Sequence, residues 1–244
     1  MSAPLPIFAG DLAGPEAQST VDGPLGPVPM PGKPRFNANW MQRHLSDPYV
    51  RKAQQLGYRS RAAFKLAEID DQDKLIRPGI CVVELGAAPG SWTQVLCQRL
   101  GRSEGRLRGR IIAMDMVAMD TLEGVEFVLG DFREAQAIEA LENCLAGRRC
   151  ELVISDMAPN LSGVAVADAA RMADLVELAL EFAKVRLRVG GCLLVKSFQG
   201  AGFSQQVEAF KRSFRKVHVR KPKASREESA EAYLLGKGLL APDG

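Results

Sequence analysis

Charged side chains and glycines follow a series of short apolar segments in this 244-residue chain. Each segment has the length and composition of a buried strand, and each is closed by a residue that could bind a ligand or take part in catalysis. In chain order these residues are Gly86, Asp115, Asp131, Asp156 and Lys196. Ligands of open parallel sheets bind beyond the carboxyl ends of the strands. The series therefore predicts one ligand crevice lined by acids and a lysine.

The loop "ELGAAPGSW" places Gly86 and Gly90 where the backbone must turn sharply and pass close to a ligand. It is neither a P-loop nor G-x-G-x-x-G, and Asp115 follows Gly86 by about 29 residues rather than the ~20 of a dinucleotide site. An acid at Asp115 suits the two hydroxyls of a ribose, and Asp131 in "GDF" suits an adenine amino group. The pattern favours an adenosine cofactor without phosphates, S-adenosyl-L-methionine. Helix caps or turns are the alternative explanation for any single acid.

Lys196 ends the apolar segment "GGCLLVKSF", where a buried charge is costly unless it is paired or neutralised. A neighbouring cation would favour the neutral, basic form of this lysine, and nearby acids would oppose it. Asp156 begins the irregular loop "DMAPNLSG". This loop resembles the motif of amino-methyltransferases but lacks its second proline and its aromatic residue, so a base nitrogen is not the favoured acceptor.

Strands must alternate with helices to bring these residues together. We predict a Rossmann-like α/β fold, with a seven-stranded, mostly parallel sheet, one antiparallel strand near the C-terminus, and helices on both faces. Two helices precede the sheet, one capped by Ser46 and one over 60–71. The predicted strands are 80–85, 110–115, 125–131, 151–156, 192–198, 216–221 and 231–238, and the later helices are 91–100, 133–145, 168–187 and 203–214.

The domain organisation follows from composition. Residues 1–34 are rich in proline and glycine and have few large apolar residues, which predicts a flexible tail. Residues 35–240 form a single predicted domain, with basic helices over 35–78 and the catalytic sheet over 79–240, and residues 241–244 form a short second tail.

Positive charge is concentrated in two blocks, although the net charge is only +3. Residues 33–65 hold eight lysines and arginines against one acid, and residues 211–223 hold seven and no acid. The blocks predict a nucleic-acid partner whose phosphates they contact beside the active site; a solvated charged surface is the alternative. The candidates in the first block are Arg35, Arg43, Arg51, Lys52, Arg59 and Arg61.

Cysteine and histidine usage excludes several other classes of protein. The five cysteines lack paired spacing and are expected to be reduced thiols of a cytoplasmic protein. With two histidines and no Cys-x-x-Cys, no metal site is expected. The chain has neither a signal peptide nor an apolar run long enough to span a membrane, so no membrane association is expected.

Several motifs in order, "SDPYV", "GYRSRAAFKL", "ELGAAPGSW", "GDF", "SDMAPNLSG", "VKSFQG" and "VRKP", resemble the FtsJ/RrmJ family of ribose 2′-O-methyltransferases over about residues 36–240. The resemblance implies a class I S-adenosylmethionine-dependent methyltransferase of the bacterial branch. Its implied substrate is a uridine in the A-loop of 23S ribosomal RNA on the 50S subunit. The catalytic residues it implies are Lys65, Asp156, Lys196 and Glu231, and the cofactor residues are Gly90, Trp92, Asp115, Asp131 and Asp156, with Gly86 in the same loop.

The sequence departs from this family at three places. Ser91 replaces a glycine and should be tolerated if its hydroxyl caps the following helix. Ser229-Ala230 precede Glu231 in place of Ser-Arg, which leaves Glu227 and Glu228 as rivals for the catalytic glutamate. The loop over 101–110 is longer than usual.

Three functions remain open, and we expect a monomer in each case. The first is methylation of large-subunit RNA, with a lysine as base or as the group that orients the hydroxyl. The second is 2′-O-methylation of a transfer RNA or an mRNA cap. The third is a non-catalytic RNA-binding assembly factor.

Overall fold

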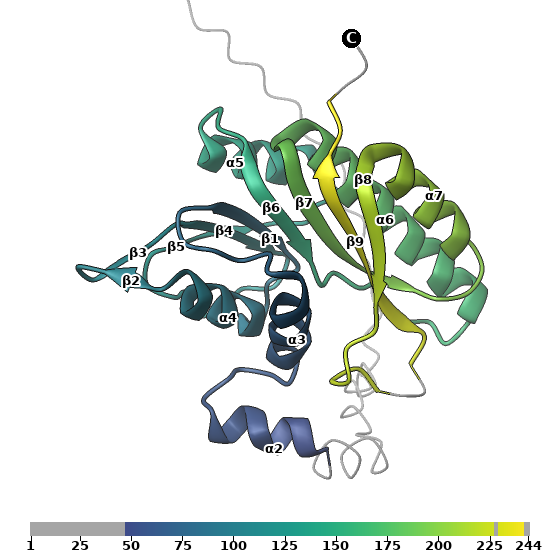
Figure 1. Ribbon diagram of the computed structural model, residues 1–244. Helices are drawn as coiled ribbons and strands as arrows, with labels where there is room; N and C mark the ends of the chain where they lie inside the picture. The colour runs from purple at the N-terminus through teal and green to yellow at the C-terminus, as the bar shows by residue number, and fades with distance from the viewer. Residues whose placement is uncertain (1–46, 227–228, 242–244) are drawn as a thin grey trace, which may run out of the picture.

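Seven strands form one sheet in the structure, a computed structural model that describes residues 47–226 and 229–241 (Figure 1). Their order is β5-β4-β1-β6-β7-β9-β8, and β9 is antiparallel to both of its neighbours while the other pairs are parallel. The predicted fold, including its single antiparallel strand, is confirmed. The strands are β1 (Cys81–Leu85), β4 (Arg110–Asp115), β5 (Val125–Leu129), β6 (Cys150–Ser155), β7 (Leu187–Phe198), β8 (Phe214–Arg220) and β9 (Glu231–Leu239).

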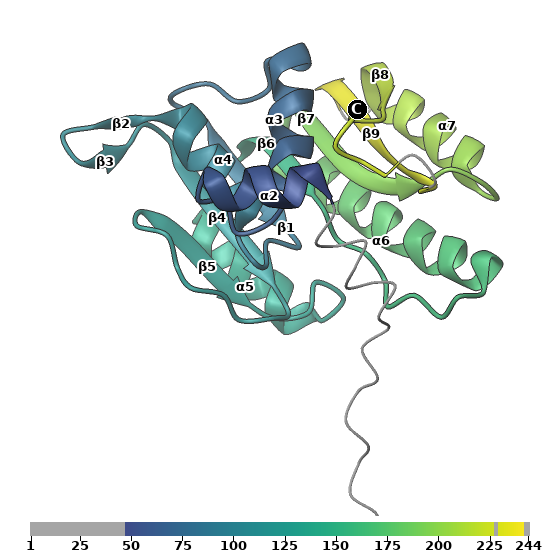
Figure 2. The ribbon, with the colours of Figure 1, turned by 90° about the horizontal axis from the view of Figure 1, so that it is seen from below.

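Helices cover both faces of the sheet, as Figure 2 shows from below. Side chains of α3 and α4 pack with Val82, Ile111 and Leu152 on one face. Side chains of α5, α6 and α7 pack on the other face with Val83 and Ile112. Both faces of the central strands are buried, which explains their continuous apolar sequences. The helices are α2 (Pro48–Gln55), α3 (Ala63–Asp73), α4 (Ser91–Leu100), α5 (Ala135–Leu145), α6 (Ala165–Arg186) and α7 (Phe203–Ser213).

Two predicted helix caps are wrong. The cap of α2 is Asp47 rather than Ser46, because the Asp47 carboxylate accepts the amide of Tyr49 and Pro48 suits the first helical position. The cap of α4 is Gly90, and the Ser91 hydroxyl bonds to Ser60 Oγ (2.8 Å) instead of capping.

Two further elements differ from prediction. The long loop after α4 contains a small hairpin, β2 (Arg102–Ser103) with β3 (Arg106–Leu107), which projects from the body in both ribbon views. Strand β7 begins at Leu187, before the predicted start, and pairs there with Cys150 of β6. Some predictions concern residues outside the described ranges: the N-terminal tail, Arg35, Arg43, Ser46, Glu227, Glu228 and the last three residues.

Among the described helices, none is long and apolar enough to cross a lipid bilayer. All five cysteines, which lie within the described ranges, are free thiols.

Candidate active site

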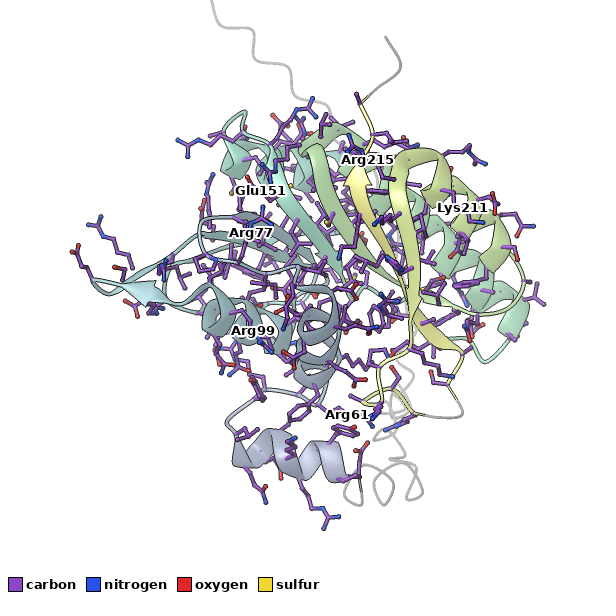
Figure 3. The ribbon with its side chains drawn as sticks, viewed as in Figure 1. Arg61, Arg77, Arg99, Glu151, Lys211 and Arg215 are labelled. Atoms are coloured by element: carbon purple, nitrogen blue, oxygen red, sulfur yellow. The ribbon has the colours of Figure 1, made fainter. Side chains whose placement is uncertain are left out.

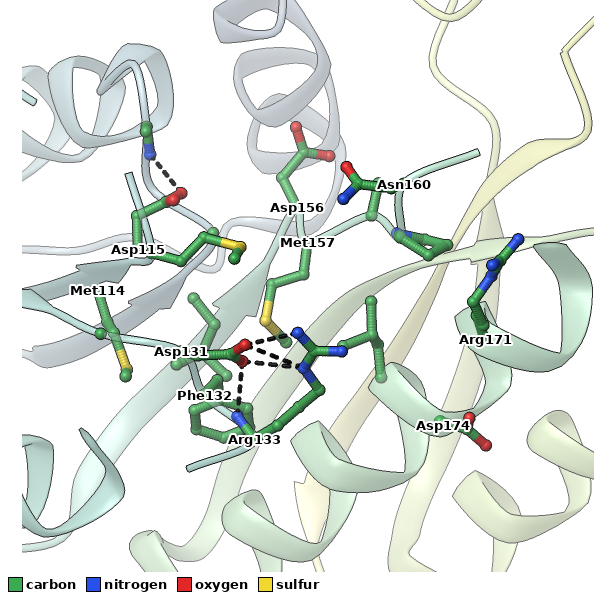
Figure 4. A pocket seen from close by; sticks show the side chains of 18 residues that line it. Met114, Asp115, Asp131, Phe132, Arg133, Asp156, Met157, Asn160, Arg171 and Asp174 are labelled. Carbon is green, nitrogen blue, oxygen red and sulfur yellow. Dashed lines mark hydrogen bonds and ion pairs between the residues drawn. The ribbon is translucent and has the colours of Figure 1, made fainter. Parts of the chain in front are cut away.

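A cavity of about 490 Å³ lies beyond the carboxyl ends of β1, β4, β5 and β6 (Figure 4). Three of the predicted acids, Asp115, Asp131 and Asp156, line it, as does Gly86. Its volume is typical of a site for a small ligand. Apolar side chains complete the wall, including Met114, Met116, Phe132 and Met157.

Asp115 is held in place by backbone amides. Its carboxylate accepts the N–H groups of Ala88 and Val117, each at 2.8 Å. Gly86 turns with a φ of +76°, and a Cβ there would lie 2.8 Å from the Met157 backbone nitrogen. Glycine is therefore required, because the end of β1 passes directly against the loop after β6.

Asp131 is paired with Arg133 across the floor of the cavity (Figure 4). The Arg133 guanidinium donates to both carboxylate oxygens, and these hydrogen bonds lower the pKa of Asp131. The Arg133 side chain is 64% exposed, so it can move aside for a ligand.

This donor set fits S-adenosyl-L-methionine. Carboxylates at the ends of β4 and β5 can accept hydrogen bonds from ribose hydroxyls and an adenine amino group, and the methionine-rich wall can pack on an adenine ring.

Gly90 and Trp92, which were predicted to bind the cofactor, are not among the residues that line the cavity. A side chain at Gly90 would collide with the Arg59 guanidinium, which donates to the carbonyls of Pro89 and Asp120. The indole of Trp92 is buried, donates to the Ala62 carbonyl (2.8 Å), and lies with its ring 5.6 Å from that of Tyr233. Trp92 therefore links α4 to the start of α3 and to β9, and the absence of a side chain at Gly90 leaves room for Arg59.

The four predicted catalytic residues form one chain of charges. Lys196 Nζ lies 3.0 Å from Asp156 Oδ1 and 3.9 Å from Glu231 Oε2, and Lys65 Nζ lies 2.7 Å from Glu231. Lys196 and Glu231 are each only 8% exposed. Lys65 on α3 and Glu231 on β9, which are 166 positions apart along the sequence, are thus brought together at the ends of β6 and β7.

The register between β7 and β9 creates this arrangement. Lys196 is paired with Tyr233 and Phe198 with Glu231. Because side chains alternate along a strand, Tyr233 and Glu231 project from the same face as Lys196. If β9 slipped by one residue against β7, Tyr233 and Glu231 would turn to the other face of the sheet and Ala232 would lie on the face of Lys196.

Tyr233 belongs to the site although it was not predicted. Its hydroxyl donates to Asp156 Oδ1 at 2.7 Å. Burial and the nearby charges of Asp156 and Glu231 raise the pKa of Tyr233 well above its usual value, so it remains a donor. The available signal was its position two residues after Glu231 in a predicted strand. Ser225, which donates to Glu231 Oε1 at 2.7 Å, carried no such signal.

Among the described residues, the polar partners of Lys196 Nζ are all hydrogen-bond acceptors. Besides the two carboxylates, its Nζ donates to the backbone carbonyl of Asp156 at 2.9 Å. These contacts suit an ammonium group.

Two predicted phosphate contacts are engaged within the protein, and part of the second basic block lies far from the site. Arg59 bonds to backbone carbonyls and Arg61 to Asp47. Lys216 pairs with Lys237 of β9, six residues from Glu231, which is about 20 Å along a strand. Figure 3 shows Arg215 at the end of the sheet opposite Arg61, and Lys211 on α7, away from Arg61. The prediction that the whole block 211–223 flanks the active site is therefore wrong, because β8 runs parallel to β7 and begins at the far end.

Residues 58–239 match the model of a protein family described as FtsJ-like methyltransferase. The chain is 55% identical over 217 residues to the ribosomal RNA large subunit methyltransferase E of Burkholderia mallei (strain SAVP1) and, equally, to that of Burkholderia thailandensis, covering 86% of this chain and 99% of each relative. A crystal structure of a ribosomal RNA methyltransferase from Plasmodium falciparum superposes with a TM-score of 0.67 at 27% identity, covering 75% of this chain and all of that one.

Proposed function

The chain belongs to the FtsJ-like methyltransferase family, and from this premise we propose that it methylates the 2′-hydroxyl of a uridine ribose in the A-loop of 23S ribosomal RNA. It is a methyltransferase that uses S-adenosyl-L-methionine and acts on ribosomal RNA. The proposal adds the nucleotide, the hydroxyl, and the assembled 50S subunit as the form of the substrate. The name of its 55% identical relatives supports the choice of the large subunit.

One observation carries the choice of a ribose hydroxyl. The chain of charges from Asp156 through Lys196 and Glu231 to Lys65 connects the cofactor cavity to a second, smaller cavity of about 230 Å³. Asp156 lines the first cavity, and Lys65 and Glu231 line the second. An acceptor lying along this chain would meet cations that can orient a hydroxyl and take up its proton.

We assign the roles as follows. The bound cofactor supplies a sulfonium methyl, a strong electrophile, so the enzyme must align the acceptor and remove one proton. Lys196 first loses its own proton to solvent, then orients the hydroxyl with its neutral amine and accepts the hydroxyl proton. Asp156 holds Lys196 at the cavity wall, and Glu231 holds Lys65. Asp115 and Asp131 bind the adenosine moiety.

We further propose that the protein acts as a cytoplasmic monomer. All four charged residues of the catalytic chain come from one polypeptide, so no second copy is needed to complete the site.

Transfer of labelled methyl groups tests the function. Purified protein, labelled cofactor and large subunits from cells that lack the gene should give label in 23S RNA, and nucleoside mapping should locate it on one uridine ribose. Label in transfer RNA or capped RNA alone would favour the second candidate. Binding of subunits without any transfer would indicate an assembly factor.

A further inference from the structure

The smaller cavity lies between the start of α3 and the loop that joins β8 to β9. Its lining includes three cations, Arg61, Lys65 and Arg226, against one acid, Glu231. Figure 3 shows Arg61 between α2 and this loop, at the end of the molecule where α3 begins. The excess of positive charge in a concave site suits an anion.

Arg61 is fixed before any ligand arrives. Its guanidinium donates to the Asp47 carboxylate and to the Ala224 carbonyl, and it lies 5.6 Å from the ring centroid of Tyr49. Its Nε is buried and has no hydrogen-bond partner within the part of the chain that the structure describes. An arginine held on three sides loses little rotamer freedom when it binds an anion.

Arg226 brings a second positive charge toward Arg61. Burial lowers the pKa of Arg61, the charge of Arg226 lowers it further, and Glu231 opposes both. Two arginines that repel each other across a cavity would be stabilised by an anion between them. Arg226 is exposed, so it can adjust to the ligand.

Neutral groups of the cavity add hydrogen-bonding capacity. Ser229 contributes a hydroxyl whose oxygen accepts the Glu231 amide at 3.1 Å, whereas the Ser60 hydroxyl donates to Ser91 Oγ. The eleven-residue helix α3 begins beside them with no acid in its first turn. Its first amides, those of Ala63, Phe64 and Lys65, already donate to the carbonyls of Ser60, Arg61 and Ala62, so the helix adds only the positive end of its dipole.

We propose that this cavity binds a backbone phosphate of the RNA, next to the ribose that is methylated. The inference rests on the proposed function. Lys65 and Glu231 line the cavity and also end the catalytic chain of charges, so an anion held here lies beside the acceptor. Riboses and phosphates alternate along RNA, so a ribose at Lys196 carries a phosphate toward the cavity. Arg61 and Arg226 bind it through their guanidinium groups, and this contact sets the depth to which the ribose enters.

Substitution of the exposed arginine tests the phosphate contact. In methyl transfer to large subunits, Arg226→Gln should raise the KM for subunits about tenfold, leave the cofactor Kd unchanged, and reduce the slope of log(kcat/KM) against log salt by about 0.7 to 0.9. Arg226→Lys keeps the charge but loses the planar guanidinium. Its KM for subunits should lie between that of wild type and that of Arg226→Gln. The matched control is Arg148→Gln, an exposed arginine between α5 and β6 at the opposite end of the sheet, which should behave as wild type.

The outcomes separate this inference from the proposed function. If wild type transfers no methyl group to large subunits, the proposed function fails. If wild type is active and Arg226→Gln matches Arg148→Gln in KM and salt slope, the phosphate site alone is overturned. A second measurement is the Kd of wild type and Arg226→Gln for large-subunit RNA from which the ribosomal proteins have been removed. An effect of Arg226→Gln that is present on subunits but absent on this RNA would mean that the cavity contacts an acidic ribosomal protein, which also contradicts the inference.

Discussion

At the scale of single residues, the site places two hydrogen-bond donors on one carboxylate. Lys196 lies between Asp156 and Glu231, and burial together with the charges of those two acids keeps the nearby Tyr233 a neutral donor by raising its pKa. Asp156 receives hydrogen bonds from both of them. Its position therefore depends on β7 and β9 together, and removing either donor should disturb the alignment of the acceptor.

Replacing Tyr233 with phenylalanine isolates one of these bonds. The ring would still pack beside Trp92, but Asp156 Oδ1 would lose the donor at 2.7 Å. We expect kcat to fall about tenfold, the equivalent of ~1.4 kcal/mol, with little change in the KM for RNA. Single-turnover transfer to large subunits measures this. A kcat equal to that of wild type would mean that the bond does not position Asp156.

Glu84 gives the protein a specific pH dependence. Burial raises the pKa of Glu84 to about 8, a hydrogen bond from Thr93 opposes the rise, and the charges of Asp156 and Asp115 add to it. Between the usual value of 4.5 and about 8, the folded state binds more protons than the unfolded state. The free energy of unfolding should therefore fall with rising pH across this window, by up to about 1.4 kcal/mol per unit.

Glu84→Gln provides the comparison, since glutamine can still accept the Thr93 hydroxyl. The midpoint temperature of thermal unfolding should fall between pH 5 and pH 8 by more for wild type than for the variant. Parallel pH profiles for the two proteins would show that Glu84 is already ionised in the folded state.

At the scale of elements, each functional side chain is set by a loop or a strand pair. The loop after β6 forms one wall of the cofactor cavity, with Pro159 and Asn160 in its lining. Asp168 on α6 holds this loop by accepting the amides of Ser162 and Gly163, the Ser162 hydroxyl, and Arg171.

Asp168→Ala should release this wall. The hydrogen bond from the Ser162 amide and the others lower the pKa of Asp168 to about 2, so the carboxylate stays ionised and its contribution is lost only as pH falls from about 3.8 toward 2. We expect the cofactor Kd to rise about tenfold at neutral pH, together with a lower midpoint of thermal unfolding. Isothermal titration with S-adenosyl-L-methionine measures the change. Asp168→Asn keeps an acceptor, so its cofactor Kd should lie between those of wild type and Asp168→Ala. An unchanged Kd for the alanine variant would contradict the role of the loop.

At the scale of the whole molecule, the sheet order gathers the strand ends into one site. The pattern of the sequence was sufficient to predict the sheet, its antiparallel strand, and the acids at the ends of β4, β5 and β6, because buried parallel strands have a distinctive composition. Lys65 and Glu231 could be predicted only from the family resemblance, since they meet through the packing of α3 and the register of β9. The hairpin β2–β3 escaped prediction because strands of two residues have no periodicity.

The positions of Lys211 and Arg215, far from the active site, could not be predicted from the sequence either. A count of charges along the chain cannot tell which end of a strand carries them. The direction of β8 moves these residues away from the active site, and only the loop that follows Arg220 returns to it.

The most direct measurement is methyl transfer by Lys196→Met, compared with wild type on large subunits, together with the cofactor Kd of both proteins. Methionine keeps much of the length and apolar stem of lysine but can neither donate to Asp156 nor accept a proton. We predict that transfer falls by at least about a thousandfold, a range consistent with loss of general-base catalysis, while the cofactor Kd stays within about twofold of wild type. Substantial residual transfer with normal cofactor binding would contradict the assignment of the Asp156–Lys196–Glu231–Lys65 chain as the catalytic centre.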